Sequence, residues 1–337
     1  MAPKSKILLL GAIDHQPALS AYNALSPLAT LVTTSATSPQ DFLTECTRPN
    51  SPLSGTLIIY RTFASISITG PINSSLIPAL RALGVRAICH NGAGYDQIDV
   101  RACCTAGIHV SNVPQAVDAS TADTALYLLL GALREFHAPT VALREGKWRG
   151  EPEPPLGHDP EGKVLGILGM GGIGKNLKAK AEALGMRVLY HNRREVDGEE
   201  GYRGFEELLR EVDVLSLNLP LNPSTHHIIS TPQFNMMKDS IIIINTARGG
   251  VIDEAALVYA LDSGKVRSVG LDVYEDEPKV HPGLLENPRV TLLPHMGTWT
   301  VETQTKMELW NIDNVRSMLE TGRLKSRVPE QKDLPYD

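Results

Sequence analysis

Two side chains that could do chemistry stand just past short apolar runs. Arg248 follows Ile241–Ile244, and His295 follows Leu292-Leu293-Pro294. A guanidinium can bind a carboxylate through paired hydrogen bonds and polarise a neighbouring carbonyl group. An imidazole can donate a proton to a forming alkoxide and take it back in the reverse direction. Together they predict chemistry on a 2-oxo acid; the alternatives are a surface arginine and a structural histidine.

A glycine-rich turn lies near the middle of the chain, between the apolar run Val164–Leu168 and a helix expected over Lys175–Leu184. Its spacing is G-x-G-x-x-G. The first glycine makes the turn, the second lets a pyrophosphate approach, and the third allows close packing of helix on strand. The phosphates would lie at the helix N-terminus. This order predicts a dinucleotide site at Gly169, Gly171, Gly172, Ile173 and Gly174.

The next strand-like run, Arg187–Tyr190, is followed by Asn192, Arg193 and Arg194, where the ribose of the cofactor would be bound. A carboxylate at this place accepts hydrogen bonds from the 2′-hydroxyl of NAD, but Glu195 comes only after the arginines. Guanidinium groups bind a 2′-phosphate instead. The sequence therefore favours NADPH/NADP, with NADH/NAD as the possible second cofactor; the alternative is a solvated charge cluster.

The elements that position these residues alternate along the chain, as they do in parallel sheets covered by helices on both faces. The predicted fold class is therefore α/β, with two doubly wound parallel sheets. After the glycine turn, strands are expected at Val212–Leu219, Ser240–Thr246, Val266–Val273 and Val290–Pro294. Before it, strands are expected at Lys6–Leu10, Leu28–Thr33, Leu57–Tyr60, Ala87–His90 and Ile108–Ser111.

Helices are expected where longer mixed segments connect these strands. Ser120–Phe136 is long and apolar, and Ser120 and Thr121 are candidate caps for its start. A segment rich in proline and glutamate follows at 150–155, which indicates an arm or loop. The chain ends in an amphipathic helix, Val301–Glu320.

Length and composition are typical of a globular enzyme. The 337 residues suggest two domains, and 42% hydrophobic with 21% charged residues is ordinary. The net charge of −6 indicates no nucleic-acid or membrane partner. Four cysteines without metal or redox spacing predict no metal site and fit a reducing compartment. No signal peptide or membrane-length apolar stretch is evident, so a cytoplasmic protein is expected.

Four ordered motifs resemble those of the D-2-hydroxyacid dehydrogenases, which include glyoxylate and hydroxypyruvate reductases. They are the glycine turn and the segments 245–253, 270–278 and 293–297. The resemblance implies two Rossmann-like or flavodoxin-like domains. Residues 1–116 and 299–337 would form a discontinuous substrate domain, and 117–298 an inserted dinucleotide-binding domain. It also implies a homodimer, held by the cofactor domains and an arm at about 120–160.

The resemblance also implies roles for further residues. It selects Glu277, rather than Glu275 or Asp276, as the carboxylate beside the catalytic His295. Asp272 would accept a hydrogen bond from the nicotinamide carboxamide, or alternatively cap a turn. The amides of Ala93 and Gly94 would hold the substrate carboxylate opposite Arg248, or alternatively form a tight turn that needs positive φ. The residues expected against the cofactor include Thr246, Ala247, Asp272, His295 and Gly297.

Substrate size is left open by the sequence. Two features favour glyoxylate and hydroxypyruvate as substrates: the arginines after Arg187–Tyr190, which favour NADPH, and the similarity to the reductases of this family. Phe63 and Trp299 could shape the pocket or pack in the core. Trp299 is compatible with bulkier or aromatic 2-oxo acids, as in D-mandelate dehydrogenases. Animal reductases carry a second tryptophan three residues beyond the one matching Trp148, and here that position is Glu151.

Two other members of this fold group were considered. Formate dehydrogenases are disfavoured because relatives of that type have glutamine where Glu277 stands. C-terminal binding proteins, which act mainly as dinucleotide-dependent corepressor scaffolds, keep the same arginine, glutamate and histidine. This chain lacks their long low-complexity tails. A reductase is therefore the preferred interpretation.

Overall fold

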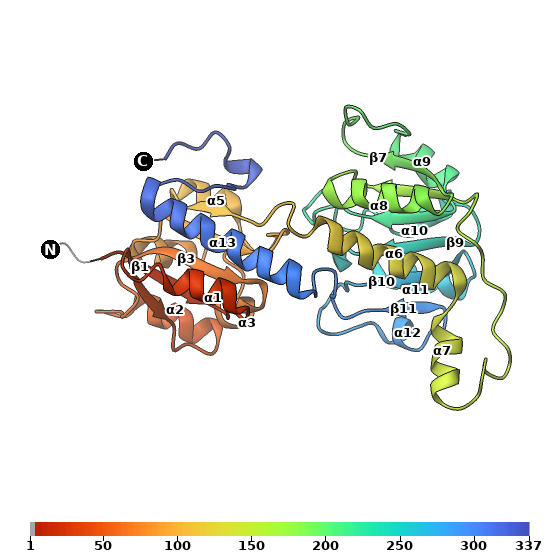
Figure 1. The fold of residues 1–337 in the computed structure, drawn as a ribbon, viewed down its shortest axis with the longest axis horizontal. Helices are drawn as coiled ribbons and strands as arrows, with labels where there is room; N and C mark the ends of the chain where they lie inside the picture. Colours follow the sequence, from red (N-terminus) through yellow and green to blue (C-terminus); the bar gives the residue numbers. More distant parts are fainter. Residues whose placement is uncertain (1–3, 337) are drawn as a thin grey trace. The chain divides into compact units, whose positions relative to one another are not determined.

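The computed structural model describes residues 4–336, which fall into two compact units. The first unit runs to Val117 and resumes at Thr300, and the second spans Asp118–Trp299 (Figure 1). Each unit has a parallel sheet between two helical layers, so the predicted α/β class with two doubly wound sheets is confirmed. Within residues 4–336 no helix combines the length and the apolarity needed to cross a membrane.

The first unit contains a five-stranded sheet in the order β2-β1-β3-β4-β5, with all neighbours parallel. Helices α1 and α13 pack on one face and α2, α4 and α5 on the other. The elements are β1 Lys6–Leu10, α1 Gln16–Asn23, β2 Thr30–Thr33, α2 Pro39–Thr47, β3 Thr56–Thr62, η1 Phe63–Ser65, α3 Ile66–Thr69, α4 Ile77–Leu83, β4 Ala87–Asn91, α5 Val100–Thr105, β5 His109–Ser111, α13 Val301–Thr321 and η3 Pro329–Gln331.

The second unit contains a six-stranded parallel sheet in the order β11-β10-β9-β8-β6-β7. Helices α6 and α8 cover one face, and α9, α10 and α11 cover the other (Figure 1). The elements are α6 Asp118–Arg134, α7 His137–Arg144, β6 Val164–Leu168, α8 Gly172–Ala183, β7 Arg187–His191, α9 Phe205–Glu211, β8 Val214–Leu217, α10 Thr231–Met236, β9 Ile241–Asn245, η2 Gly249–Val251, α11 Glu254–Asp262, β10 Val266–Leu271, α12 Pro282–Leu285 and β11 Val290–Leu292.

The strand order of the second unit places a topological switch between β6 and β8. The chain leaves β6 toward β7 on one side, while β8 begins the run of strands on the other. Ligands of doubly wound sheets bind outside the carboxyl ends of the strands at such a point. The glycine turn follows β6 directly and therefore lies at this edge of the sheet.

Two helices begin earlier than the sequence predicted. Helix α8 starts at Gly172, inside the glycine turn, rather than at Lys175. Helix α6 starts at Asp118, so Ser120 and Thr121 are not caps but buried residues of its first turn. The Ser120 hydroxyl donates to the Gly297 carbonyl at 2.7 Å, a partner that is 177 residues away in the chain. Because that partner is so distant, the local sequence pattern could not indicate it.

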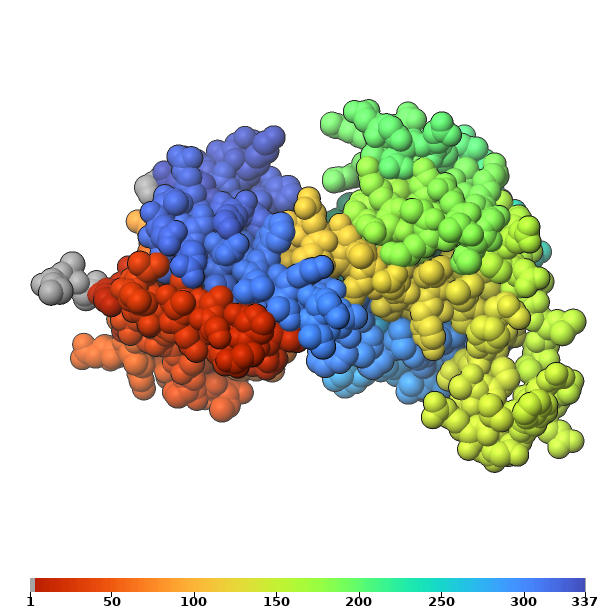
Figure 2. All heavy atoms as spheres, in the orientation of Figure 1, coloured from red at the N-terminus to blue at the C-terminus, as the bar shows by residue number. Residues whose placement is uncertain are grey.

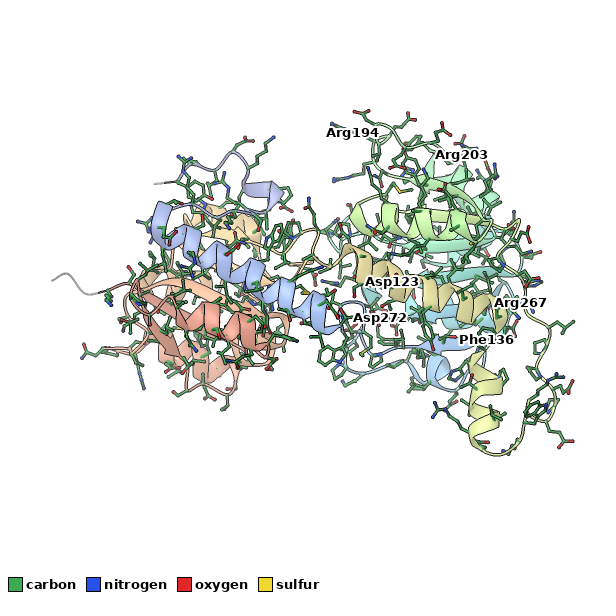
Figure 3. All side chains as sticks on the ribbon, in the orientation of Figure 1. Asp123, Phe136, Arg194, Arg203, Arg267 and Asp272 are labelled. Carbon is green, nitrogen blue, oxygen red and sulfur yellow. The ribbon has the colours of Figure 1, made fainter. Side chains whose placement is uncertain are left out.

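The segment after α6 is a protruding arm, formed by α7 and the extended chain that leads to β6. None of the residues of α7 is buried, and the arm stands out from the body of the second unit (Figure 2). Phe136 lies at the junction of α6 and α7 (Figure 3). Several large apolar side chains of α6 and the arm are exposed to solvent, namely Tyr127, Phe136, Val141, Leu143, Trp148 and Leu156.

Candidate active site

Arg248 lies three residues past the end of β9, at the carboxyl edge of the sheet of the second unit. The buried side chain of Asn245 holds the turn between them: its Nδ2 donates to the Arg248 carbonyl at 2.9 Å, and its Oδ1 accepts from the Ala247 amide at 3.0 Å. Gly249 then packs against the backbone after β10, where a Cβ would overlap the carbonyl of Tyr274. Asn245, which the sequence interpretation gave no role, therefore fixes the loop that carries Arg248.

His295 and Glu277 are in direct contact in the second unit. The Nδ1 of His295 lies 2.9 Å from Oε2 of Glu277, and Oε1 of Glu277 accepts from the Tyr274 amide at 3.0 Å. A carboxylate only accepts hydrogen bonds, so Nδ1 carries the proton in this pair. The Nε2 atom of His295 is then the ring nitrogen that can exchange a proton with a substrate.

The other two acids of this stretch have different partners. Glu275 pairs with His227 and accepts from the Glu254 amide at 3.4 Å, while Asp276 forms an exposed ion pair with Lys279. The carboxylate that faces His295 is thus Glu277, as the family resemblance selected. Its catalytic role stays a prediction.

The carboxyl group of Glu277 has a perturbed environment. Burial by itself would raise its pKa, but the hydrogen bond and the charge of His295, the hydrogen bond from the Tyr274 amide and, as the smallest effect, the charge of Arg248 outweigh burial and lower that pKa. The carboxylate is therefore ionised at neutral pH and is suited to hold an imidazolium.

Asp272 organises the turn on which His295 sits. Its carbonyl accepts from the His295 amide at 2.8 Å, and its two carboxylate oxygens accept from the amides of Met296 and Gly297. Burial raises the pKa of Asp272, an effect that these amides partly offset. These contacts match the turn-capping alternative; contact with a nicotinamide stays a prediction.

The backbone of His295 is itself unusual, because its φ of +55° lies in the left-handed region. Residues other than glycine rarely adopt this conformation, although asparagine, aspartate and histidine do so more often than the rest, and such positions cluster at functional sites. The three hydrogen bonds that Asp272 accepts from the amides of residues 295–297 hold it there.

The glycine turn fits the dinucleotide that its spacing predicts. Gly169 has a φ of +106°, and a Cβ there would lie 2.6 Å from the Asn218 carbonyl oxygen. A Cβ on Gly174 would lie 2.5 Å from the Gly169 carbonyl oxygen, the close helix–strand packing expected of the third glycine. Gly171 caps α8, and nothing lies within 4 Å of its Cβ position. That open backbone at a helix N-terminus can receive a pyrophosphate.

The remaining glycine-turn residues have other surroundings. Gly172 makes room for the Asp118 carboxylate of α6, which a Cβ would overlap. Ile173 packs against the core between α6 and α8. The Asn192 side chain accepts from the Met170 amide at 2.7 Å and so ties the end of β7 to the turn.

Two buried oxygens at the same edge have no hydrogen-bond partner within the described chain. They are Oγ1 of Thr246, just past β9, and Oδ1 of Asn218, just past β8. Buried polar atoms are normally paired, so each has capacity for a ligand. Thr246 was predicted to contact the cofactor together with its neighbour Ala247; Asn218 was missed, because no motif marks it.

Arg193 and Arg194 are exposed in the loop after β7, and Arg194 lies at the edge of the second unit (Figure 3). On α8, Lys175 and Lys178 both pair with Glu199, at 3.4 and 2.8 Å. The loop beyond β7 also contains acids, namely Glu195, Asp197, Glu199 and Glu200, so attraction of a phosphate would depend on the local position of Arg193 and Arg194 and not on the net charge of the region.

In the first unit, Ala93 and Gly94 follow β4 in a partly buried loop. Gly92 does not need a left-handed φ; it is required because a Cβ there would lie 2.6 Å from Nε2 of His90.

Phe63 is partly buried at the start of η1. Trp299, the last residue of the second unit, is 69% exposed. Neither aromatic is part of a buried core.

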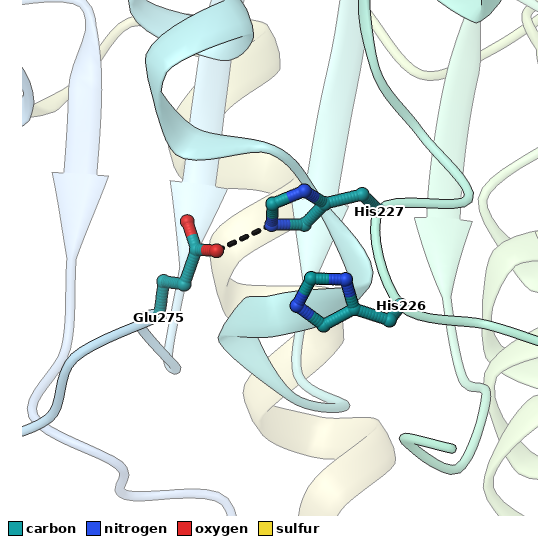
Figure 4. A group of neighbouring side chains, drawn as sticks. All are labelled: His226, His227 and Glu275. Carbon is teal, nitrogen blue, oxygen red and sulfur yellow. Dashed lines mark hydrogen bonds and ion pairs between the residues drawn. The ribbon is translucent and has the colours of Figure 1, made fainter. Parts of the chain in front are cut away.

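One group of side chains among residues 4–336 has the donor types of a metal site: His226, His227 and Glu275 (Figure 4). Their ligand atoms lie within 4.8 Å of one another, and the two imidazole rings stack at 3.9 Å. His227 and Glu275 are joined by a direct hydrogen bond, which an ion would have to break. The hydrogen bond between His227 and Glu275 links the turn before α10 to the segment after β10.

Replacing Glu277 with glutamine should lower kcat/KM for the expected 2-oxo acid reduction at neutral pH by about tenfold or more, the effect of a lost charge-assisted hydrogen bond. In the expected reaction the imidazole of His295 donates a proton, and the ionised carboxylate that accepts from its Nδ1 holds the ring in place. Glutamine keeps the size of the side chain but removes its charge. The check is kcat/KM at neutral pH with Asp276→Asn as the matched control. A wild-type kcat/KM in Glu277→Gln would contradict a role for Glu277 in orienting His295.

Comparisons with known proteins agree with this geometry. Residues 126–297 match the model of the D-isomer specific 2-hydroxyacid dehydrogenase NAD binding domain. The chain is 50% identical to 4-methyl-2-oxopentanoate reductase A of Aspergillus oryzae over 331 residues, 97% of this chain and 98% of that one. It is 45% identical to glyoxylate reductase 1 of Saccharomyces cerevisiae, over 98% of this chain and 96% of that one.

Two solved structures are also similar over nearly the whole chain. A glyoxylate reductase from Paecilomyes thermophila has a TM-score of 0.93 and 51% identity, covering 98% of this chain and 100% of that one. The NADPH-dependent glyoxylate/hydroxypyruvate reductase of Sinorhizobium meliloti, in complex with NADP and malonate, has a TM-score of 0.84 and 29% identity, covering 97% of each chain.

Proposed function

This chain belongs to the D-isomer specific 2-hydroxyacid dehydrogenase family and is an NAD(P)-dependent reductase of 2-oxo acids, and we propose that it prefers NADPH and acts on short acids. The proposed reactions are glyoxylate to glycolate and hydroxypyruvate to D-glycerate. The contact between Nδ1 of His295 and Glu277 is the observation that carries the reductase chemistry. The exposed Arg193 and Arg194 after β7 support NADPH, and the relatives named glyoxylate reductase support the short acids.

The proposed mechanism assigns one task to each of these side chains. A reduced dinucleotide whose pyrophosphate is held at the glycine turn would supply the hydride that C2 of the 2-oxo acid receives. Arg248 binds the carboxylate and polarises the carbonyl, while Nε2 of His295 gives its proton to the carbonyl oxygen. Glu277 keeps the resulting neutral imidazole oriented through Nδ1. The product gains one hydride on carbon and one proton on oxygen, which completes the alcohol.

A second candidate substrate class is supported by the relative from Aspergillus oryzae, whose name specifies 4-methyl-2-oxopentanoate. A branched acid of that size is one of the bulkier 2-oxo acids with which Trp299 is compatible. The glyoxylate reductases of comparable identity support the short acids. We rank the short acids first because two of the relatives are named glyoxylate reductase.

The experiment that tests the proposal is a steady-state panel. The values of kcat/KM would be compared for glyoxylate, hydroxypyruvate, 4-methyl-2-oxopentanoate and phenylglyoxylate, each with NADPH and with NADH. Highest values for the first two acids with NADPH support the proposal. Turnover mainly of the larger acids would shift it to the second class. Absence of turnover with all four would favour a dinucleotide-dependent scaffold.

Replacing Arg193 and Arg194 together with serine is expected to lower kcat/KM for NADPH by about 10–100-fold, with little change for NADH. The proposed reason is the loss of charge-assisted hydrogen bonds to the 2′-phosphate, which from exposed arginines are together worth about 1.4–2.8 kcal/mol. Arg187→Ser with Arg210→Ser, on the same unit, removes the same charge elsewhere and serves as control. Equal losses with both cofactors would show that the arginines do not read the phosphate.

We also propose that the second unit is the dinucleotide-binding domain, that the first is the substrate domain with Ala93 and Gly94 as carboxylate ligands, and that the protein is a homodimer. The exposed apolar side chains of α6 and the arm support the dimer, since a surface of this kind marks an interaction site. A particle mass of a single chain would contradict it.

A further inference from the structure

The loop after β4 in the first unit is tied down through three consecutive carbonyl groups. The Gly92 carbonyl accepts from the Val113 amide at 2.9 Å, and the Ala93 carbonyl accepts from Nδ2 of Asn112 at 2.7 Å. The Gly94 carbonyl lies 2.9 Å from Nε2 of His90. A carbonyl only accepts, so Nε2 carries the proton there. Both anchoring segments belong to the sheet: His90 lies in β4, and residues 112 and 113 directly follow β5.

Because each peptide group is planar and trans, the three bound carbonyl groups also fix the directions of the amide N–H groups that follow them. In a trans peptide the C=O of one residue and the N–H of the next point in opposite directions. The amides of Ala93, Gly94 and Tyr95 therefore face away from the tethers. None of these three N–H groups donates a hydrogen bond within the described chain. Successive backbone N–H groups in a turn, when they have no partner in the protein, can bind an anion.

We propose that His90 and Asn112 are positioning residues for substrate binding, because they hold three amides, including that of Tyr95, as a cradle for the substrate carboxylate. The sequence interpretation gave only Ala93 and Gly94 as ligands and assigned no role to His90 or Asn112. This inference rests on the proposed function for the identity of the anion. It adds one donor to the site and two side chains that act through the backbone.

The surroundings of the loop show that it is held on several sides. His90 is fully buried, and its ring fills the space that a side chain at position 92 would need. The Tyr95 hydroxyl donates to the Glu330 carboxylate at 2.9 Å, and the buried Arg61 donates to the side chain of Gln97 at 2.7 Å. The amides are thus fixed before an anion arrives, which lowers the entropy cost of binding.

The test uses leucine, which matches the size of asparagine and lacks a donor. Asn112→Leu and His90→Leu each free one carbonyl, and His90→Gln restores an N–H donor near the Nε2 position. Asn311→Leu is the control: Asn311 donates at 3.1 Å to the Cys89 carbonyl, which lies in β4 rather than in the loop. Asn311 is fully buried in this unit, as His90 is, while Asn112 is partly buried.

The readouts are KM and kcat for glyoxylate, the Kd for NADPH, and the Kd of oxalate for the NADP-loaded protein. We expect both leucine variants at positions 90 and 112 to raise KM and the oxalate Kd about tenfold, the effect of one lost hydrogen bond. The NADPH Kd should be unchanged, and His90→Gln should recover most of the loss. Asn311→Leu should change neither KM nor the oxalate Kd.

The outcomes separate this inference from the proposed function. Wild-type KM and oxalate Kd in folded Asn112→Leu and His90→Leu proteins would overturn the inference while the reductase proposal stands. The same losses in Asn311→Leu would also overturn it, since they would reflect general destabilisation. If the wild type reduces no 2-oxo acid but oxalate binding still depends on His90 and Asn112, the cradle stands and the proposed function fails.

Discussion

Replacing His295 with asparagine is expected to lower kcat for glyoxylate reduction by about 10²–10⁴-fold, the usual contribution of a positioned general acid. Asparagine suits this position because it tolerates the left-handed φ of +55° that His295 adopts. Its side chain can still donate to Glu277, but it has no proton to transfer at neutral pH. The change therefore removes the proposed proton transfer while keeping the fold of the turn.

The measurement is kcat at saturating glyoxylate together with the Kd for NADPH, which should stay near the wild-type value. His281→Asn is the matched control, since His281 is exposed in the same unit and caps α12 through its Nδ1. It should leave kcat unchanged. If His295→Asn retains kcat within a few-fold of the wild type, His295 is not the acid of this reaction.

The strands of both sheets were predictable because each is a short apolar run that ends in turn-forming residues. The predictions for β1 and β6 agree with the structure at both ends, and the others differ by one to a few residues. Buried parallel strands are apolar on both faces, so their signal lies in the local sequence alone. The strand-end positions of Arg248 and His295 followed from the same pattern.

The contacts that orient these residues were not predictable, because they join segments distant in sequence. Asp272 binds the amides of Met296 and Gly297, 24 and 25 residues away. The choice of Glu277 over Glu275 depends on which side chain reaches His295, and periodicity says nothing about that. Asn245 acts locally, but its two hydrogen bonds to the following turn appear only when the turn is formed.

The second large effect is expected at Arg248. Replacement with glutamine should lower kcat/KM for glyoxylate by about 10²–10³-fold, the loss typical of one preorganised electrostatic contact to the reacting oxygen. Replacement with lysine should recover only part of it. Lysine keeps the charge but lacks the planar pair of donors that binds a carboxylate at two points. A kcat/KM that decreases from the wild type to the lysine variant and again to the glutamine variant therefore indicates bidentate binding.

Arg289 provides the control for this series, because it is a partly buried arginine of the same unit that donates to the Leu261 carbonyl at 2.6 Å. Arg289→Lys and Arg289→Gln should leave kcat/KM unchanged. It is also informative how the effect of replacing Arg248 divides between kcat and KM. A rise in KM alone means that Arg248 only binds the ground state, whereas an equal fall in kcat and kcat/KM means that it acts on the transition state. Because Arg248 is proposed both to bind the carboxylate and to polarise the carbonyl group, we expect both parameters to change. Unaltered kinetics in Arg248→Gln would remove the arginine from the mechanism.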